Sequence, residues 1–354
     1  MKIAINYKKG GMLSPDNDMR FGTSFTDKMF EMNYDKDKGG WYGPVVKNFE
    51  PFVLSPATLV FHYAQEIFEG QKAYKREDGR IVLFRPDMNI KRFNRSAEQM
   101  SMPTIDENLF MDALDTLIWE ERDWIPSKAE HSLYIRAAMI ATDPVLGVRA
   151  GSQYKFFIIC SPTGCYFPEG FKPLHIWVSD NHARTVAGGI GEAKTGGNYS
   201  ASLKAMAEAR EKGCSQVLWL DGQERKYIDE ISTMNVFMVK NGTIVTPALT
   251  GGILHGITRD SVIVAAKDLG YSVEERKISI TELCDGITSG EVTEFFGCGT
   301  ACVISPVGEL KYKERSYVIN GSKTGKITQN IYDTITGIQN GKIKDKFGWI
   351  KVIE

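Results

Sequence analysis

The sequence predicts a mixed α/β (α+β) protein of two domains, and three observations support this expectation. Segments rich in aromatic and β-branched residues, typical of strands, alternate with helical segments in both halves of the chain. A Pro- and Gly-rich stretch, 162–173, should interrupt regular structure near the midpoint. The 354 residues suffice for two domains. We therefore expect a first domain over 1–166, a connecting loop over 167–180 and a second domain over 181–354.

Each expected element follows from its local sequence. Short apolar runs bounded by turn residues predict strands, and Asn241-Gly242 is a strong signal for a hairpin turn between two of them. A helix should begin at Ser200, which can cap it, and end before Gly213. A second helix should run over 258–269 and end at Gly270. The expected strands cover 132–139, 155–161, 174–179, 216–220, 233–240, 243–246 and 292–296, and the last of them should break at 297–300.

Composition excludes several classes of function. The chain is 42% hydrophobic and 25% charged, and its formal net charge of -1 gives no general reason to bind nucleic acid or an anionic membrane. No apolar run reaches the roughly 20 residues of a membrane-spanning helix, and the first ten residues lack a signal peptide's apolar stretch. Six cysteines without a pair of C-x-x-C motifs predict neither a disulfide scaffold nor a zinc site. We expect a cytoplasmic protein with no metal, nucleic-acid or membrane partner.

The Gly-rich stretch 188–199, GGIGEAKTGGNY, allows two interpretations. The first is a phosphate-binding P-loop that ends in Lys194-Thr195. Ala193 then stands where the motif requires the glycine that lets backbone N–H groups wrap the phosphates, and polar residues precede the stretch where an apolar strand should. Both departures count against a nucleotide-binding protein.

The second interpretation makes Lys194 a Schiff-base lysine for pyridoxal phosphate. A crowded, desolvated site lowers the pKa of an amine, and flanking glycines let its backbone approach a flat cofactor. This cofactor also requires a carboxylate at its pyridine nitrogen and a phosphate site such as a helix N-terminus. Taken alone, Lys194 is more simply a solvated surface lysine.

Three downstream segments meet these requirements together, although each has a plainer explanation. Glu230 begins an apolar strand and would otherwise be a solvated cap. Gly256-Ile257-Thr258 opens a helix with free N–H groups, which most often bind water. The segment 297–301 leaves a strand with backbone N–H groups and the Thr300 hydroxyl exposed, which could be a simple turn. Their joint occurrence favours a cofactor site.

With these residues identified, the chain resembles the branched-chain amino acid aminotransferases, which are pyridoxal-phosphate enzymes of fold type IV, in the class IV aminotransferase family. The resemblance covers nearly the whole chain, and the N-terminal FGTSFTD segment is similar to the longer, mammalian-type branch. It implies a smaller N-terminal α/β domain and a larger, barrel-like C-terminal α/β domain. The segments that carry it include RFGTSFTDKMF, HYAQEIFEGQKAY, LFRPDMNIKRFNRSA, SLYIRAAMIA, CYFPEG, KTGGNYSAS, DEISTMNVF, GILHGITRDS and EFFGCGTAC.

The resemblance assigns a role to each matching cofactor residue. Lys194 would form the aldimine and move the proton between the substrate Cα and the cofactor. Tyr199 would donate to the phenolic oxygen, and Glu230 would pair with the pyridinium nitrogen. Arg92, the backbone of Ile257 and Thr258, and the Thr300 hydroxyl would bind the phosphate. Thr233 would lie beside the ring or Lys194.

The resemblance also implies a substrate pocket that a homodimer partner helps to complete. Arg136 matches an arginine associated with the side-chain carboxylate of glutamate. Backbone groups at Thr300 and Ala301 would hold the α-carboxylate. The remaining expected lining residues are Phe21, Tyr63, Phe68, Tyr134, Leu146, Val148, Tyr166, Thr233 and Met234, and plain core packing is the alternative for these apolar and aromatic side chains.

The function implied is ping-pong transamination through a Lys194 aldimine, in which L-leucine, L-isoleucine or L-valine and 2-oxoglutarate give branched 2-oxo acids and L-glutamate. This activity suggests a role in branched-chain amino acid biosynthesis. Other fold type IV enzymes, a D-amino acid aminotransferase or an aminodeoxychorismate lyase, remain alternatives, and a P-loop protein is a remote one. Some relatives carry a C-x-x-C redox switch, whose positions here hold Cys302 and Ser305. Because a disulfide needs two sulfurs, that switch is absent in its usual form, and whether Cys298 could replace the missing thiol stays open.

Overall fold

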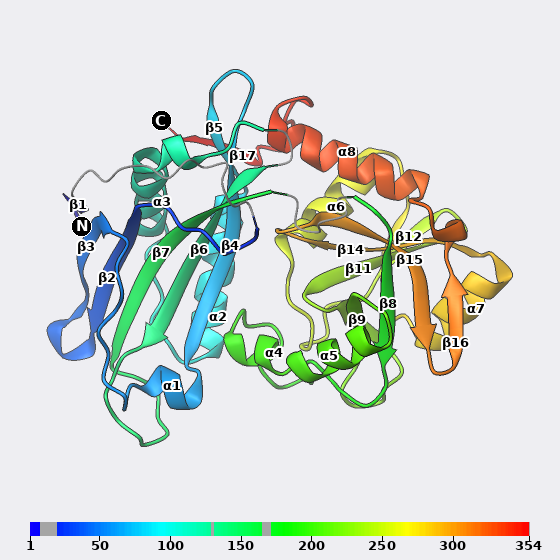
Figure 1. Ribbon diagram of the computed structural model, residues 1–354, viewed down its shortest axis with the longest axis horizontal. Helices are drawn as coiled ribbons and strands as arrows, with labels where there is room; N and C mark the ends of the chain where they lie inside the picture. The colour runs from blue at the N-terminus through cyan, green and yellow to red at the C-terminus, as the bar shows by residue number, and fades with distance from the viewer. Residues whose placement is uncertain (8–19, 129–130, 165–170, 354) are drawn as a thin grey trace. The chain divides into compact units, whose positions relative to one another are not determined.

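The computed structural model describes residues 1–7, 20–128, 131–164 and 171–353. The chain forms two compact units, each with its own sheet (Figure 1). Unit 1 comprises 1–166, 193–196 and 338–354, and unit 2 comprises 167–192 and 197–337. The fold is of the mixed α/β class, as the sequence predicts.

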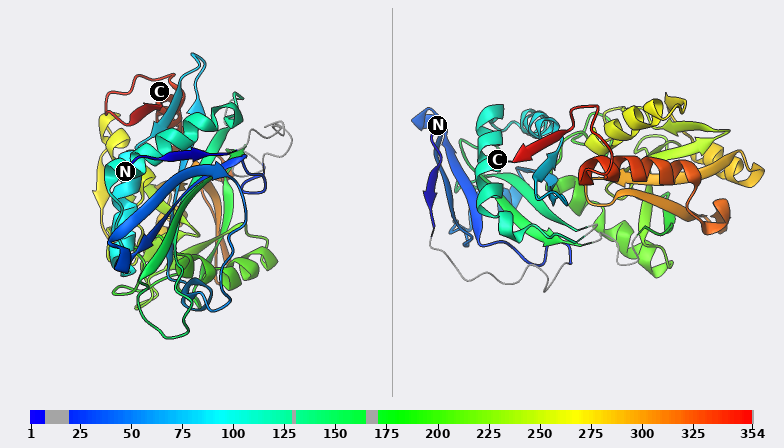
Figure 2. Two further views of the ribbon diagram at one scale, coloured as in Figure 1. Left: turned by 90° about the vertical axis from the view of Figure 1, so that its left-hand side faces the viewer. Right: turned by 90° about the horizontal axis from the view of Figure 1, so that it is seen from above.

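Unit 1 is an eight-stranded sheet in the order β1-β3-β2-β7-β6-β4-β5-β17. All neighbours are antiparallel except β1 and β3. Figure 2 shows β1 and β17 near the two ends of the chain, and both are edge strands of this one sheet. The strands are β1 (Ala4–Asn6), β2 (Lys28–Asp35), β3 (Gly40–Asn48), β4 (Glu66–Lys75), β5 (Ile81–Phe84), β6 (Ser132–Ala141), β7 (Gln153–Thr163) and β17 (Ile350–Ile353).

Two long helices cover one face of the unit 1 sheet, α2 (Pro86–Gln99) against β4 and α3 (Glu107–Glu120) against β2 and β3 (Figure 1). Alternation along β4 turns Ile67 and Ala73 into the apolar core that these helices close. The same face also carries Glu69 and Gln71, both buried. Buried polar side chains require hydrogen-bond partners, so the middle of β4 is a candidate part of a functional site. The unit also contains α1 (Leu59–Tyr63) and the short 3-10 helices η1 (Lys36–Lys38) and η2 (Arg122–Trp124).

The strands of unit 2 close on themselves. The order is β10-β9-β8-β15-β14-β11-β12-β13, and β10 also pairs with β11, so six strands form a ring. Apolar side chains such as Ile176 and Val178 fill one core, while Trp177 packs on the other side, where α5 lies against β8 and β9. The strands are β8 (Leu174–Ser179), β9 (Gln216–Leu220), β10 (Ile228–Ile231), β11 (Met234–Lys240), β12 (Thr243–Thr246), β13 (Val273–Glu275), β14 (Val292–Gly299), β15 (Val303–Tyr312) and β16 (Arg315–Val318).

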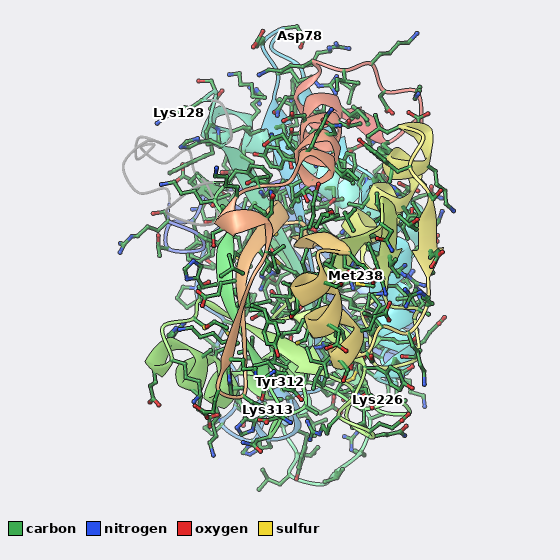
Figure 3. All side chains as sticks on the ribbon, turned by 90° about the vertical axis from the view of Figure 1, so that its right-hand side faces the viewer. Asp78, Lys128, Lys226, Met238, Tyr312 and Lys313 are labelled. Atoms are coloured by element: carbon green, nitrogen blue, oxygen red, sulfur yellow. The ribbon has the colours of Figure 1, made fainter. Side chains whose placement is uncertain are left out.

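Helices on the outside of the unit 2 sheet complete its packing. Helices α6 and α7 contact β14. Met238 of β11 is buried in the core of unit 2, and Tyr312 and Lys313 lie at the tip of the β15–β16 hairpin (Figure 3). The helices are α4 (Gly196–Ser200), α5 (Leu203–Glu211), α6 (Ile257–Asp268), α7 (Ile280–Ser289), η3 (Asn320–Ser322) and α8 (Lys326–Asn340), and the chain passes back into unit 1 within α8.

Two segments that the sequence assigns to the second domain belong to unit 1. One is 338–354, because β17 pairs along its whole length with β5. The other is 193–196, which carries Lys194 and bonds to β4. Neither pairing has a local sequence signal, since both join residues far apart in the chain.

Three expected boundaries are wrong for local reasons. The helix predicted at Ser200 begins at Leu203, because the Ser200 hydroxyl donates to the Gly197 carbonyl at 3.1 Å and closes the short helix α4. The strand predicted to break at Gly297 continues to Gly299, because Gly297 and Cys298 pair with β11 on one side and β15 on the other. Pro162 lies within β7, paired with Leu133, where β2 no longer flanks the strand and no N–H is needed.

The hairpin turn at Asn241-Gly242 is confirmed. Both residues have positive φ, 49° and 79°, as a two-residue turn of this type requires. The expected strands 174–179, 216–220 and 243–246 match β8, β9 and β12. Residues 165–170, which include part of the Pro- and Gly-rich stretch 162–173 and of the expected connecting loop 167–180, lie outside the described residues.

Candidate active site

The backbone of Lys194 is fixed between β4 and α2. The Phe68 N–H donates to the Lys194 carbonyl at 2.9 Å, and the Lys194 N–H donates to the Ser96 hydroxyl at 3.0 Å. The Thr195 hydroxyl donates to the Glu66 carbonyl at 2.7 Å, and the Gly196 N–H donates to the Glu66 carboxylate. Four such bonds on three consecutive residues set the direction in which the lysine side chain leaves the chain.

The Lys194 amine is a perturbed group, not a solvated surface lysine. Its side chain is partly buried, and Nζ lies 5.0 Å from the centre of the Phe68 ring. Burial lowers the pKa of Lys194 to about 8, and the positive charge of Arg92 adds to this effect against the opposing charge of Glu69. A lysine that loses its proton this readily can act as a nucleophile and as a base near neutral pH.

Arg92 is held by a buried carboxylate that sequence analysis missed. Its Nε donates to Glu69 Oε1 at 2.7 Å and a terminal nitrogen donates to Oε2 at 2.9 Å, and Asn89 donates to Oε2 at 2.7 Å. Both members of the ion pair are nearly inaccessible. Although burial opposes it, the charge of Arg92 and the bonds to the carboxylate hold the pKa of Glu69 below its usual value. This bidentate pair fixes the guanidinium.

We expect Glu69→Gln to destabilise unit 1 because it leaves Arg92 buried without a counter-charge. Removing one member of a buried ion pair costs about 3–5 kcal/mol. The midpoint of urea unfolding measures the loss. Asp87→Asn is the matched control on the same helix as Arg92, since its ion pair with Lys91 spans 3.8 Å and is half-exposed, and it should cost at most about 1 kcal/mol. Equal losses in the two variants would mean that Glu69 is no more than a replaceable polar side chain.

An aromatic and cationic group occupies the other face of β4 and β6. The Arg136 guanidinium lies 4.5 Å from the centre of the Phe68 ring and donates to the Tyr134 hydroxyl at 3.1 Å. Phe21 meets Tyr134 edge-on, with ring centres 4.7 Å apart. Gly70 makes this arrangement possible, because a Cβ there would lie 2.1 Å from the Tyr134 hydroxyl oxygen. Five of the expected residues are thus grouped in unit 1, namely Phe21, Phe68, Tyr134, Arg136 and Lys194.

Three other expected pocket residues of unit 1 are largely exposed. The Tyr63 hydroxyl donates to the Leu146 carbonyl. The Leu146 side chain is 62% exposed and Val148 is 82% exposed. Both apolar side chains are therefore accessible for contact with another molecule. Tyr166, also expected in the pocket, lies outside the described residues.

Glu230 is the buried carboxylate of unit 2. It is 2% exposed, which excludes the alternative of a solvated cap. The Leu254 N–H donates to its Oε1 at 2.9 Å, and Arg184 Nε lies 3.2 Å from Oε2. Arg184 in turn donates to the Gly252 carbonyl at 2.7 Å. The carboxylate is therefore held by a fixed N–H and a fixed cation, which orient it.

The helix α6 begins beside the same cluster of unit 2. Asn235 donates to the Leu254 carbonyl at 3.0 Å, and its side-chain oxygen lies where a Cβ at Gly256 would stand. No side chain caps the helix at Gly256. Ile257 and Thr258 are its first residues, so their backbone N–H groups have no acceptor within the helix and suit an anion.

The remaining expected residues of unit 2 lie in a short helix, in turns and at the start of a strand. Tyr199 belongs to the short helix α4. Thr233 is exposed beside Ser232, which has a positive φ of 49°. Thr300 and Ala301 form the turn after β14. Met234 is buried and its sulfur lies 3.3 Å from that of Cys302, while Ser305 is buried in β15.

Sequence analysis missed the residues that hold these groups in place. Glu69 alternates with Ile67 and Ala73 along β4, so the face it occupies could have been read from the strand period. Arg184, Asn235 and Ser96 bond across elements and have no such signal. Among the residues that the structure describes, no group of three or more His, Cys, Asp or Glu could hold a metal ion, and no helix is long and apolar enough to cross a membrane.

A lysine with a lowered pKa, a buried carboxylate and an uncapped helix are the groups that a pyridoxal-phosphate enzyme needs, and comparison with known proteins agrees. The model of the family described as amino-transferase class IV matches residues 66–310. The chain belongs to the class IV aminotransferases.

Individual relatives are similar over almost the whole chain. The branched-chain-amino-acid aminotransferase 2 of Bacillus subtilis is 51% identical over 336 residues, which are 95% of this chain and 92% of that protein. The crystal structure of the Escherichia coli branched-chain amino acid aminotransferase has a TM-score of 0.76 at 28% identity and covers 87% of this chain and 97% of its own. The branched-chain amino acid aminotransferase of T.th., solved with pyridoxamine 5'-phosphate, has a TM-score of 0.74 at 26% identity and covers 91% of this chain and 98% of its own.

Proposed function

We propose that this protein is a branched-chain amino acid transaminase that depends on pyridoxal 5'-phosphate. The observation that carries the proposal is the lysine Lys194, which lies in a segment, 194–196, anchored by four hydrogen bonds and has its pKa lowered to about 8. Family membership supports the reaction class, and the names of relatives at about half identity support the substrate class. These names do not favour a D-amino acid aminotransferase, an aminodeoxychorismate lyase or a P-loop protein.

The chain's own residues fit the cofactor. Glu230 offers a carboxylate for a pyridinium nitrogen, and its ion pair with Arg184 orients it. Arg92 and the uncapped N–H groups of Ile257 and Thr258 suit a phosphate. We assign Tyr199 as donor to the phenolic oxygen, Thr300 to the phosphate and Thr233 to the vicinity of the ring. A related structure contains pyridoxamine 5'-phosphate, which supports the assignment.

The proposed mechanism divides the work among three side chains. The cofactor supplies an electron sink when bound. Lys194 Nζ would take the proton from the substrate Cα and deliver it to the cofactor in the first half-reaction. In the second it would carry the proton from the cofactor to the Cα of the new amino acid, and a pKa near neutrality suits both directions. Glu230 holds the pyridine nitrogen protonated, and Arg92 fixes the phosphate end. The amino acid leaves as its 2-oxo acid before the second oxo acid enters, so the kinetics are ping-pong.

Two chemically different substrates must use one pocket. Phe68 and Tyr134 present aromatic surface to a branched aliphatic chain, together with Phe21, Met234 and Ala301 in this proposal. Arg136 stacks on Phe68 and bonds to Tyr134, so its charge lies against that same apolar surface. It can pair with the distal carboxylate of 2-oxoglutarate or glutamate, which an apolar pocket alone would reject.

An amino-donor screen tests the substrate assignment. The holoenzyme is supplied with 2-oxoglutarate and one amino acid at a time, in L and D forms, and glutamate formation is measured. Activity with L-leucine, L-isoleucine and L-valine supports the proposal. Activity confined to D-amino acids, or release of pyruvate from aminodeoxychorismate, contradicts it in favour of another fold type IV enzyme.

The proposal includes a cytoplasmic homodimer that acts on small amino and 2-oxo acids. The exposure of Leu146 and Val148 supports a partner, because an apolar pocket gains from a lid at roughly 25 cal/mol per Å² of surface removed from water. In this proposal these two residues, with Tyr134, close the pocket of the neighbouring subunit.

We expect two inactive variants to restore each other if the subunits share sites. A Lys194→Ala chain lacks the amine, and a Val148→Trp chain blocks its neighbour's pocket. In a mixed dimer one site combines intact Lys194 with an intact partner loop, so random pairing should restore up to about a quarter of wild-type activity. Assays after refolding the two chains together measure this. Inactive mixtures in which heterodimers are demonstrated would place Val148 at its own chain's pocket.

A further inference from the structure

Unit 2 contains a cavity of about 220 Å³ that none of the proposed cofactor or substrate residues lines. Its walls come from the turn after β9, from β10 and from the segment after β12. The apolar part is formed by Ala187, Ile228, Pro247, Ala248 and Ile253. A volume of this size is that of a small organic molecule, well above the share of one or two waters.

The carboxyl group of Asp229 lines this cavity without a partner. The residue is 7% exposed. Its carboxyl group makes no hydrogen bond or ion pair with any residue in the described parts of the chain, although a buried carboxyl group normally has several. Burial and the charge of Glu230 raise the pKa of Asp229 to about 7, against the attraction of Arg184. A buried acid left in this state gains most from a ligand that brings its own positive charge and hydrogen-bond donor.

The other charges at the cavity favour a cation as well. Asp221 and Glu224 line it together with a single lysine, Lys277, whose Nζ lies 4.5 Å from the centre of the Tyr227 ring. Asp221 already accepts four backbone N–H groups of its own turn, which ends near the outward-facing Lys226 (Figure 3). Asp229 is therefore the buried carboxyl group with free acceptor capacity, whereas Glu224 is exposed, and the walls around Asp229 suit a short aliphatic body.

We propose that this cavity binds a small aliphatic ammonium compound, whose N–H group donates to Asp229 and whose carbon skeleton lies against Ile228, Pro247 and Ile253. The ammonium could belong to a simple amine or to an amino acid. The site is separate from the proposed substrate pocket, and Asp229 is adjacent to Glu230 in β10, so occupancy would place a positive charge one residue from the proposed cofactor carboxylate.

Calorimetric titration of the holoenzyme tests the site. N,N-dimethylisobutylamine is the probe, because a tertiary amine cannot form a Schiff base with pyridoxal phosphate and so gives no heat from reaction with the cofactor. The pH is set above the pKa of Asp229, where the carboxylate predominates. We expect saturable binding that Asp229→Asn weakens at least about tenfold, as loss of a charged hydrogen bond implies. The neutral alcohol 4-methyl-2-pentanol, which has the same number and branching of heavy atoms, should bind at least about tenfold more weakly than the amine for the same reason.

Matched variants separate a built site from adventitious binding. Asp285→Asn removes an exposed carboxylate on α7 and should leave binding unchanged. Ala248→Trp fills the cavity without touching the carboxylate and should abolish binding. No binding to the wild type, or equal binding to Asp229→Asn, overturns the proposal. Competition by L-leucine against the probe would identify the source as an amino acid, and its absence would indicate a simple amine. Because the readout is heat of binding, it is independent of whether the chain transaminates.

Discussion

Lys194→Ala is expected to lower transamination by at least about 10³-fold, since proton transfer by a positioned base contributes about 10²–10⁴ and this variant also loses the covalent attachment of the cofactor. The visible absorption of the holoenzyme should shift, because the cofactor can no longer be held through the amine. The assay follows glutamate formation from L-leucine and 2-oxoglutarate at saturating pyridoxal phosphate, so that weaker cofactor binding does not mimic a catalytic loss.

The control for this variant is Lys204→Ala, which removes an exposed lysine from α5. It should retain full activity and an unchanged spectrum. A second control adds a small primary amine to Lys194→Ala, which should restore part of the rate if the missing group is the base itself. Undiminished turnover in Lys194→Ala would refute the assignment of Lys194 and with it the proposed reaction.

Glu230→Gln is expected to reduce turnover by about one to two decades, which corresponds to losing an ionic hydrogen bond of about 1.5–3 kcal/mol. A neutral amide can still accept the Leu254 N–H, but it cannot hold a pyridine nitrogen protonated. Arg184 keeps its bond to the Gly252 carbonyl, so stability should fall less than turnover. The two losses are compared by steady-state kinetics and by urea unfolding of the same preparation.

Glu314→Gln, in the exposed turn between β15 and β16, is the matched control. It makes the same chemical change away from the proposed site and should alter neither quantity. If Glu230→Gln lost stability and turnover in equal measure, the carboxylate would act only as a structural partner of Arg184.

The residues that would perform the chemistry could be predicted from the sequence more readily than the residues that hold them in place. Lys194, Glu230 and Arg92 stand in motifs that local sequence and resemblance identify together. The groups that hold them, Glu69 and Arg184, do so through contacts between elements distant in the chain. A single sequence carries no record of such pairs, and only the strand alternation around Glu69 gave a local signal.

The fold divides in the same way. Strands such as β8 and β12, and the turn at Asn241-Gly242, follow from local propensity and appear at their expected positions. The pairing of β17 with β5, and the placement of 193–196 beside β4, depend on long-range contacts. Helix α5 begins late because one hydroxyl, that of Ser200, bonds backward rather than forward. Boundaries of this kind are decided by single hydrogen bonds.

The strand β17 also orders events during protein synthesis. It occupies an edge of the unit 1 sheet, yet the ribosome makes it only after all of unit 2. While translation proceeds, β5 presents an unpaired edge, whose free N–H and C=O groups are a hazard for pairing with other nascent chains. Unit 2 is an uninterrupted stretch of the chain apart from 193–196, and it can fold before β17 joins the unit 1 sheet. The unit 1 sheet therefore lacks its last strand until translation ends. The exposed edge of β5 is accordingly the part of the nascent chain that most needs protection by a chaperone.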